Sequence, residues 1–232
     1  MITLAKPIVA EHLVHVAADA VTLDGNLRLP EDARAVVLFA HGSGSGRHSS
    51  RNRHVAQLLN EAKLATLLID LLTANEEAID LHTAHLRFDI ELLARRLVGA
   101  TDWLTQRPDT RHLPIGCFGA STGAGAAAAL VAATRRPDVI GAIVSRGGRP
   151  DLAGPALPRV RAPTLLIVGG NDVQVIELNR IALPQLGGEK RLVIVPGATH
   201  LFEEPGALDE VARLARDWFE RHLFPAAQRA SG

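Results

Sequence analysis

The stretch "LPIGCFGASTGAGAAAALVAA", residues 113–133, decides the fold of this chain. An apolar run typical of a buried strand breaks at Gly119, Ser121 and Gly123, then continues as an alanine-rich helix. A serine in such a Gly-x-Ser-x-Gly frame, between a strand and a helix, occupies a sharp, strained turn that projects its hydroxyl above a sheet. The small neighbours allow the turn, and the helix N-terminus directs N–H groups toward the serine oxygen. The pattern predicts a nucleophile at Ser121.

The composition predicts one α/β domain over residues 1–232, with a flexible tail at 225–232. Hydrophobic residues make up 47% and charged residues 22%, which is enough apolar material for one buried core. The formal net charge is zero, which argues against nucleic acid or an anionic membrane surface as a partner. Cys117 is the only cysteine, so no intrachain disulfide can form, and a buried thiol in a reducing compartment is expected. No apolar run is long enough to span a membrane. A cytoplasmic location follows as an expectation.

Apolar runs of strand length alternate along the chain with segments of helical periodicity. The alternation predicts a mostly parallel central sheet with helices on both faces. A tight turn is predicted at Asp24-Gly25, and a loop is predicted over residues 71–80. The strand segments are 11–18, 21–30, 33–40, 64–70, 113–118, 139–145, 162–170 and 190–197.

In a parallel sheet, ligands bind beyond the carboxyl ends of the strands, so partners for Ser121 should follow strands. His200 follows the last predicted strand and is the candidate base, while Asp172 follows a buried strand and a Gly-Gly turn and is the candidate acid. The order serine, aspartate, histidine is that of an α/β-hydrolase triad. Two alternatives remain open: Asp172 can instead cap the next helix, and Asp138 can be the acid, although it precedes its strand.

An acyl-transfer enzyme also needs donors for the oxyanion of its tetrahedral intermediate. The N–H of Thr122 directly follows the nucleophile, and the N–H of Ser43 lies in the glycine-containing loop after the strand at 33–40. These two residues are the candidate oxyanion hole. The same loop has some features of a phosphate-binding glycine loop, but it lacks the full Gly-x-Gly-x-x-Gly pattern. His41, which begins the loop, is interpreted as a structural histidine.

Basic residues gather in the loops predicted at the catalytic end, and Arg146 and Arg149 are the candidate substrate-binding residues. An arginine there can bind a carboxylate or phosphate through two parallel N–H···O bonds. The alternative is that the basic residues of these loops form ion pairs with acidic neighbours such as Asp70, Asp151 and Glu203. His82 and His85 have the spacing of one helical face, but no third ligand is evident, so no metal site is expected.

Four motifs together resemble the dienelactone-hydrolase-like branch of the α/β-hydrolase superfamily, over about residues 12–222. They are "HGSGSGRHSSRNR" (41–53), "GASTG" (119–123), "GGND" (169–172) and "GATH" (197–200). The resemblance implies an α/β-hydrolase fold and a triad of Ser121, Asp172 and His200. It also implies an oxyanion hole formed by Ser43 and Thr122. No cofactor is expected.

Dienelactone hydrolases proper have a cysteine nucleophile, whereas this chain has serine, which favours an ordinary ester as the substrate. Too few residues separate the strands at 139–145 and 162–170 to form a lid domain. The expectation is a serine hydrolase acting on small-molecule carboxylic esters. A thioesterase, a perhydrolase and a non-catalytic interaction module of the same fold stay open, and a homodimer is compatible with the sequence.

Overall fold

The computed structural model describes residues 10–41, 46–120 and 124–224 of the 232. Its strands are β1 (Glu11–Ala18), β2 (Val21–Arg28), β3 (Ala35–Ala40), β4 (Leu64–Ile69), β5 (Ile115–Ala120), β6 (Ile140–Arg146), β7 (Thr164–Gly169) and β8 (Lys190–Val195). They form an 8-stranded sheet in the order β1-β2-β4-β3-β5-β6-β7-β8. The pairs β1–β2 and β2–β4 are antiparallel, and the pairs from β4 to β8 are parallel.

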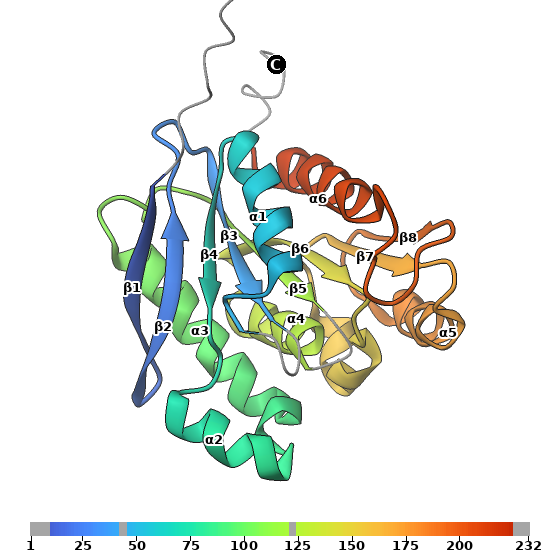
Figure 1. Ribbon diagram of the computed structural model, residues 1–232, viewed down its shortest axis with the longest axis horizontal. Helices are drawn as coiled ribbons and strands as arrows, with labels where there is room; N and C mark the ends of the chain where they lie inside the picture. Colours follow the sequence, from blue (N-terminus) through green and yellow to red (C-terminus); the bar gives the residue numbers. More distant parts are fainter. Residues whose placement is uncertain (1–9, 42–45, 121–123, 225–232) are drawn as a thin grey trace, which may run out of the picture.

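Helices cover both faces of this sheet (Figure 1). They are α1 (Ser50–Glu61), α2 (Ala74–Thr83), α3 (Ile90–Gln106), α4 (Gly125–Arg135), α5 (Val173–Ala182) and α6 (Ala207–Leu223), with short 3₁₀ segments η1 (Leu86–Phe88), η2 (Pro150–Arg159) and η3 (Leu183–Gln185). Helices α1 and α6 pack on one face, and α3, α4 and α5 lie on the other (Figure 1). The predicted fold class, a mostly parallel sheet covered on both faces, is confirmed.

The central strands are buried on both faces, as their continuous apolar sequences require. Every residue of β3, β4, β5 and β7 is buried. Alternate side chains contribute to one core under α1 and α6 and to another under α3 and α4. Cys117 lies in the second of these cores, and burial raises the pKa of its thiol to about 12, so the thiol stays protonated and inert. Within the described ranges, no helix is both long and apolar enough to cross a bilayer.

The predicted turn at Asp24-Gly25 is wrong, because β2 runs straight through both residues. Gly25 pairs with Ile69 of β4, and a Cβ at Gly25 would come within 3.1 Å of the Leu67 side chain. The glycine therefore permits close contact between two strands and does not form a turn. The β1–β2 connection lies earlier, at Asp19, which adopts a left-handed φ of 57°.

The predicted loop over residues 71–80 is also wrong, because most of that segment belongs to α2. Its start is stabilised by a capping box: the Thr73 hydroxyl accepts from the N–H of Glu76, and the Glu76 carboxylate accepts from the N–H of Thr73. The helix ends at Ala84, which has a left-handed conformation. His82 therefore belongs to α2, whereas His85 follows the end of the helix, so the two residues do not share one helical face.

The end of α2 depends on Asp80, which is 2% exposed. Its carboxylate accepts from the N–H groups of Leu86 and Arg87, at 2.7 and 3.1 Å, and pairs with the Arg87 guanidinium. Desolvation alone would raise the pKa of Asp80, but the hydrogen bonds from Arg87 and Leu86 outweigh it and lower the pKa. The carboxylate form of Asp80 therefore stabilises the folded protein.

Replacing Asp80 by alanine should lower the free energy of unfolding by about 3 kcal/mol at pH 7, because Arg87 loses its buried partner. Because the pKa of Asp80 is lowered, its carboxylate stabilises the wild-type protein above about pH 4, and this stabilisation is lost as the pH falls further. The difference in free energy of unfolding between wild type and Asp80→Ala should therefore be smaller in acid. Urea denaturation at pH 7 and pH 3.5 measures both effects. Asp109→Ala removes a more exposed pair with Arg107 and should cost less than about 1 kcal/mol. Equal losses in the two variants would contradict the prediction.

Candidate active site

Several loops meet at the carboxyl ends of the parallel strands, where the sequence predicts the reaction site. The predicted nucleophile Ser121 and the oxyanion donors Thr122 and Ser43 lie outside the described residues. The residues that flank them are described. Ala120 ends β5 and pairs with Arg146, the last residue of β6.

Two glycines allow β3, β5 and α4 to approach closely beside the predicted nucleophile. A Cβ at Gly119 would lie 2.6 Å from the Cα of Ala126, and a Cβ at Gly125 would lie 2.7 Å from the carbonyl oxygen of His41. Neither contact is sterically tolerable, so only glycine fits at these two positions. The small residues around the predicted turn thus bring the start of α4 against both strands.

The predicted acid and base are in direct contact. Nδ1 of His200 lies 2.6 Å from Oδ2 of Asp172, and both side chains are largely but not fully buried. A hydrogen on Nδ1 donated to the carboxylate fixes the ring orientation and leaves Nε2 to exchange a proton with a reacting group. Asp172 also occupies the N-cap position of α5, but its side chain makes no capping hydrogen bond. Its carboxylate binds the histidine instead.

Hydrogen bonds from Asn171 hold the loops of Asp172 and His200 together. The N–H of Asn171 donates to the carbonyl of Ala198 at 2.9 Å, and its side-chain amide donates to the carbonyl of Gly197 at 2.9 Å. Gly169, at the end of β7, allows this approach, because a Cβ there would lie 2.5 Å from the Ala198 carbonyl oxygen. The 2.6 Å histidine–aspartate contact thus lies between two loops that these hydrogen bonds connect.

The end of β6 lies beside the same histidine. Gly147 has a left-handed φ of +54°, and a Cβ at this residue would lie 3.4 Å from Cε1 of His200. Since Arg146 pairs with Ala120, both His200 and the strand before Ser121 are neighbours of the end of β6. Asp138, the alternative acid, is an exposed residue before β6 and therefore at the opposite end of that strand.

Other residues of these loops have structural contacts. His41 accepts at Nε2 from the N–H of Leu71, at 3.0 Å, so it joins the loop after β3 to the loop after β4. The N–H of Arg47 donates to Asp70 at 2.7 Å, and the guanidinium of Arg47 also pairs with Asp70. These contacts hold both ends of the segment that contains Ser43.

The two candidate substrate-binding arginines differ in their surroundings. Arg149 pairs with Asp151 through two hydrogen bonds of 2.8 and 2.7 Å. Arg146 is 4% exposed, and the part of the chain that the structure describes gives its Nη1 atom no hydrogen-bond partner. Arg51 pairs with Glu203 at 3.2 Å. Ion pairing, which the sequence left open, therefore accounts for Arg149 and Arg51 but not for Arg146.

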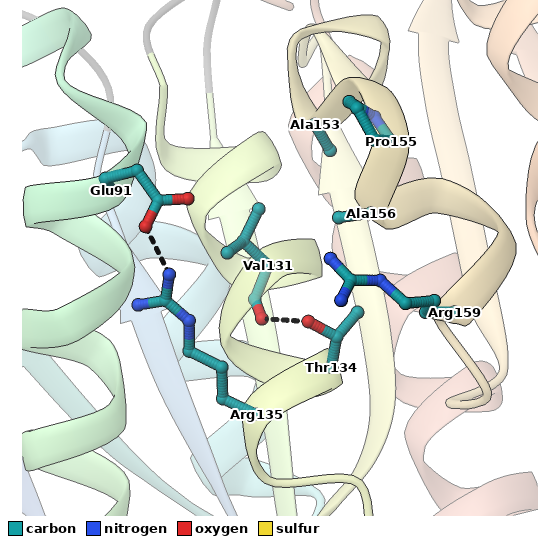
Figure 2. A pocket seen from close by; sticks show the side chains of 8 residues that line it. All are labelled: Glu91, Val131, Thr134, Arg135, Ala153, Pro155, Ala156 and Arg159. Carbon is teal, nitrogen blue, oxygen red and sulfur yellow. Dashed lines mark hydrogen bonds and ion pairs between the residues drawn. The ribbon is translucent and has the colours of Figure 1, made fainter.

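A groove of about 310 Å³ lies away from this region (Figure 2). It is bordered by the last turn of α4, which is the opposite end of that helix from the predicted nucleophile. Arg135 of α4 pairs with Glu91 of α3 along one side. This position separates the groove from the reaction site. Its lining comprises Glu91, Val131, Thr134, Arg135, Ala153, Pro155, Ala156 and Arg159.

Solved structures with the same architecture identify the family. A dienelactone hydrolase from Anabaena variabilis ATCC 29413 is 64% identical and superimposes with a TM-score of 0.90, covering 93% of this chain and 99% of that chain. This chain belongs to the dienelactone-hydrolase-like branch of the α/β-hydrolases. The resemblance seen in the sequence motifs is confirmed.

Further comparisons place this dienelactone-hydrolase-like protein among other relatives. XC6422 from Xanthomonas campestris, described as an α/β serine hydrolase without a lid, shares the fold at 20% identity and a TM-score of 0.70, covering 95% of this chain and 99% of that one. Mycobacterium tuberculosis proteins provisionally named phosphoribosyl transferases are 57% identical over 219 residues, or 94% of this chain. The chain spans 48%, about half, of the length of these curated relatives. No family model matches the sequence.

Among the described residues, no group of three or more histidine, cysteine, aspartate or glutamate side chains could hold a metal ion. In the described part of the site, the carboxylate of Asp172 and the imidazole of His200 form a hydrogen-bonded pair. This pair can accept and return a proton at Nε2 of the histidine.

Proposed function

We propose that this protein is a hydrolase that cleaves small carboxylic esters through an acyl-enzyme, with Ser121 as nucleophile, His200 as base and Asp172 as orienting acid. The observation that carries the proposal is the 2.6 Å contact between His200 and Asp172, located at the end of the sheet where β5 leads into Ser121. An imidazole oriented by a carboxylate is the group that activates a serine hydroxyl.

The proposed reaction has two halves. In the first, His200 takes the proton of Ser121 as the hydroxyl attacks the ester carbonyl, and then returns that proton to the leaving alcohol. In the second, His200 takes a proton from the water molecule that attacks the acyl-enzyme carbonyl, and then gives this proton to the Ser121 oxygen as the bond from that oxygen to the acyl group breaks and the acid leaves. The N–H groups of Ser43 and Thr122 stabilise the oxyanion in both halves. Asp172 holds the imidazole in the productive tautomer and stabilises its protonated form.

The absence of a long insertion between β6 and β7 supports a small or accessible ester as the substrate. Only a 3₁₀ segment, η2, connects these strands, with a kink at Gly154 where φ is 47°. The transferase name of the mycobacterial relatives refers to proteins about twice the length of the region matched here.

Labelling with a fluorophosphonate probe tests the proposal, because the probe reacts only with an activated serine. Mass spectrometry should find one label per chain, on the peptide containing Ser121, and His200→Ala should slow the labelling strongly. A protein that stays unlabelled, or is labelled on another serine, would contradict the proposal and favour a non-catalytic module. Comparing p-nitrophenyl esters, CoA thioesters and peracid formation with hydrogen peroxide then separates an esterase from a thioesterase or a perhydrolase.

A further inference from the structure

One polar side chain is fully buried on the core-facing side of α5. Asn179 is 0% exposed, and the other buried residues of this helix are the apolar Val175, Ile176 and Ala182. An apolar residue is the usual choice at such a position, because an amide loses its hydration on burial and must replace it with hydrogen bonds. The partners of the Asn179 amide therefore show what this residue does.

The NH₂ group of Asn179 makes two hydrogen bonds within the described residues. Nδ2 donates to the carbonyl of Gly148 at 3.0 Å and to the carbonyl of Val175, one turn earlier in α5, at 2.8 Å. These two acceptors fix the direction in which the amide faces, since a rotated amide would place its oxygen against two carbonyl oxygens. The bond to Val175 is local to the helix. The bond to Gly148 joins α5 to the loop after β6.

The loop after β6 connects this bond to the proposed base. Gly147 donates its N–H to a carbonyl of β7 at 2.8 Å and lies against the His200 ring, where a Cβ would come within 3.4 Å of Cε1. A Cβ at the next residue, Gly148, would lie 2.5 Å from the Cβ of Ala126 in α4. The loop is thus confined by His200, α4 and α5, and Asn179 supplies its hydrogen bond to α5.

The same helix begins at the proposed acid. Asp172 is the N-cap residue of α5, and Asn179 lies about two turns further along it. Asp172 contacts His200 at 2.6 Å, and His200 lies against Gly147. The next residue, Gly148, accepts from Asn179, so the chain of contacts returns to α5. The imidazole is therefore connected to the helix of its acid by two routes, the direct hydrogen bond and the loop after β6.

We propose that Asn179 is a positioning residue for His200. Its hydrogen bond to Gly148 ties the loop after β6 to α5 and thereby holds the imidazole against Asp172. This inference rests on the proposed function, in which that imidazole takes the proton of Ser121. Without the bond, the loop relaxes away from the ring, and the imidazole adopts orientations that do not favour proton transfer.

Steady-state kinetics of Asn179→Leu test this role. Leucine keeps the branched shape of the side chain and removes the donated hydrogen bonds. The substitution should lower kcat for p-nitrophenyl acetate about 10- to 100-fold, as a small misplacement of a catalytic group does, and should change KM by less than about threefold. Asn179→Ala should give the same result and replaces the leucine variant if that protein does not fold. An unchanged kcat in a folded variant would overturn the proposal.

Asn60→Leu is the matched control. Asn60 is 6% exposed and donates to the carbonyl of Leu64 at 2.8 Å and to the Thr66 hydroxyl at 3.1 Å. These acceptors lie in the first half of β4, away from the carboxyl ends of the strands. Loss of either asparagine should lower Tm by about 3–6 °C, because a buried carbonyl loses its donor, but Asn60→Leu should leave kcat unchanged. Equal losses of kcat in the two variants would reduce Asn179 to a structural residue.

NMR of the His200 ring separates this proposal from the proposed function. At a pH where the ring is neutral, its nitrogen chemical shifts report which nitrogen carries the hydrogen, whether or not an ester is hydrolysed, and His200→Ala assigns the signals. Wild type and Asn60→Leu should show one tautomer, with the hydrogen on Nδ1, because Asp172 accepts from that atom. Asn179→Leu should show both tautomers. The expected change in a protein without esterase activity would uphold the positioning role and contradict the proposed function. A single tautomer in Asn179→Leu, or a mixture already in wild type, would overturn the proposal.

Discussion

Replacing Ser121 by alanine should lower kcat for p-nitrophenyl acetate by about 10⁶-fold, because a triad acts as a unit and loses its whole contribution with its nucleophile. The fold should be retained, since alanine is no larger than serine. Steady-state kinetics together with circular dichroism and thermal melting measure both parts of the prediction. A folded Ser121→Ala protein with near-wild-type turnover would show that another residue performs the reaction.

Ser145→Ala is the matched control. Ser145 is buried in β6, and the described residues give its hydroxyl no hydrogen-bond partner. Its removal should change kcat by no more than a few-fold, because no described contact depends on that oxygen. A large loss in this variant would show that small changes in the packing of the sheet, rather than the loss of a nucleophile, account for the effect.

Replacing Asp172 by asparagine should lower kcat by about 10⁴-fold. The amide is nearly isosteric, so the fold should be retained, but its NH₂ group favours the wrong tautomer of His200 and cannot stabilise the protonated ring. Measurement of kcat on the folded variant tests this expectation. The control, Asp138→Asn, changes an exposed carboxylate at the other end of β6 and should leave kcat unchanged. The opposite pattern, an active Asp172→Asn and an inactive Asp138→Asn, would show that the acid is Asp138 and that the proposed assignment to Asp172 is wrong.

Local sequence patterns predicted most of the fold, because apolar runs and helical periodicity are set by burial within each element. The stretch at 113–133 folds as predicted on both sides of its undescribed turn, into β5 and α4. Helix α2 was missed because its apolar positions show little periodicity, and Ile79 and Leu81 are both exposed. The signal was nevertheless present at its start, where Thr73 and Glu76 have the spacing of a capping box.

The turn predicted at Asp24-Gly25 failed for a different reason. The dipeptide is a common turn signal, but glycine also occurs where two backbones or side chains approach closely. Gly25 has the second role, because it lies against Leu67 and Leu68 of β4. These residues are more than 40 positions away in the sequence, so local pattern alone could not distinguish the two roles.

The sequence by itself determined the order of the elements, the burial of the central strands and the strand ends that Asp172 and His200 follow. These features depend on the local alternation of apolar, polar and small residues. Only the tertiary structure decided which side chains meet: His200 with Asp172 at 2.6 Å, Arg149 with Asp151, and Arg146 with no described partner. Arg146 and Arg149 look alike in the sequence. Their difference arises because strand direction turns the Arg146 side chain into the core under α1, whereas the loop after β6 leaves Arg149 beside an aspartate.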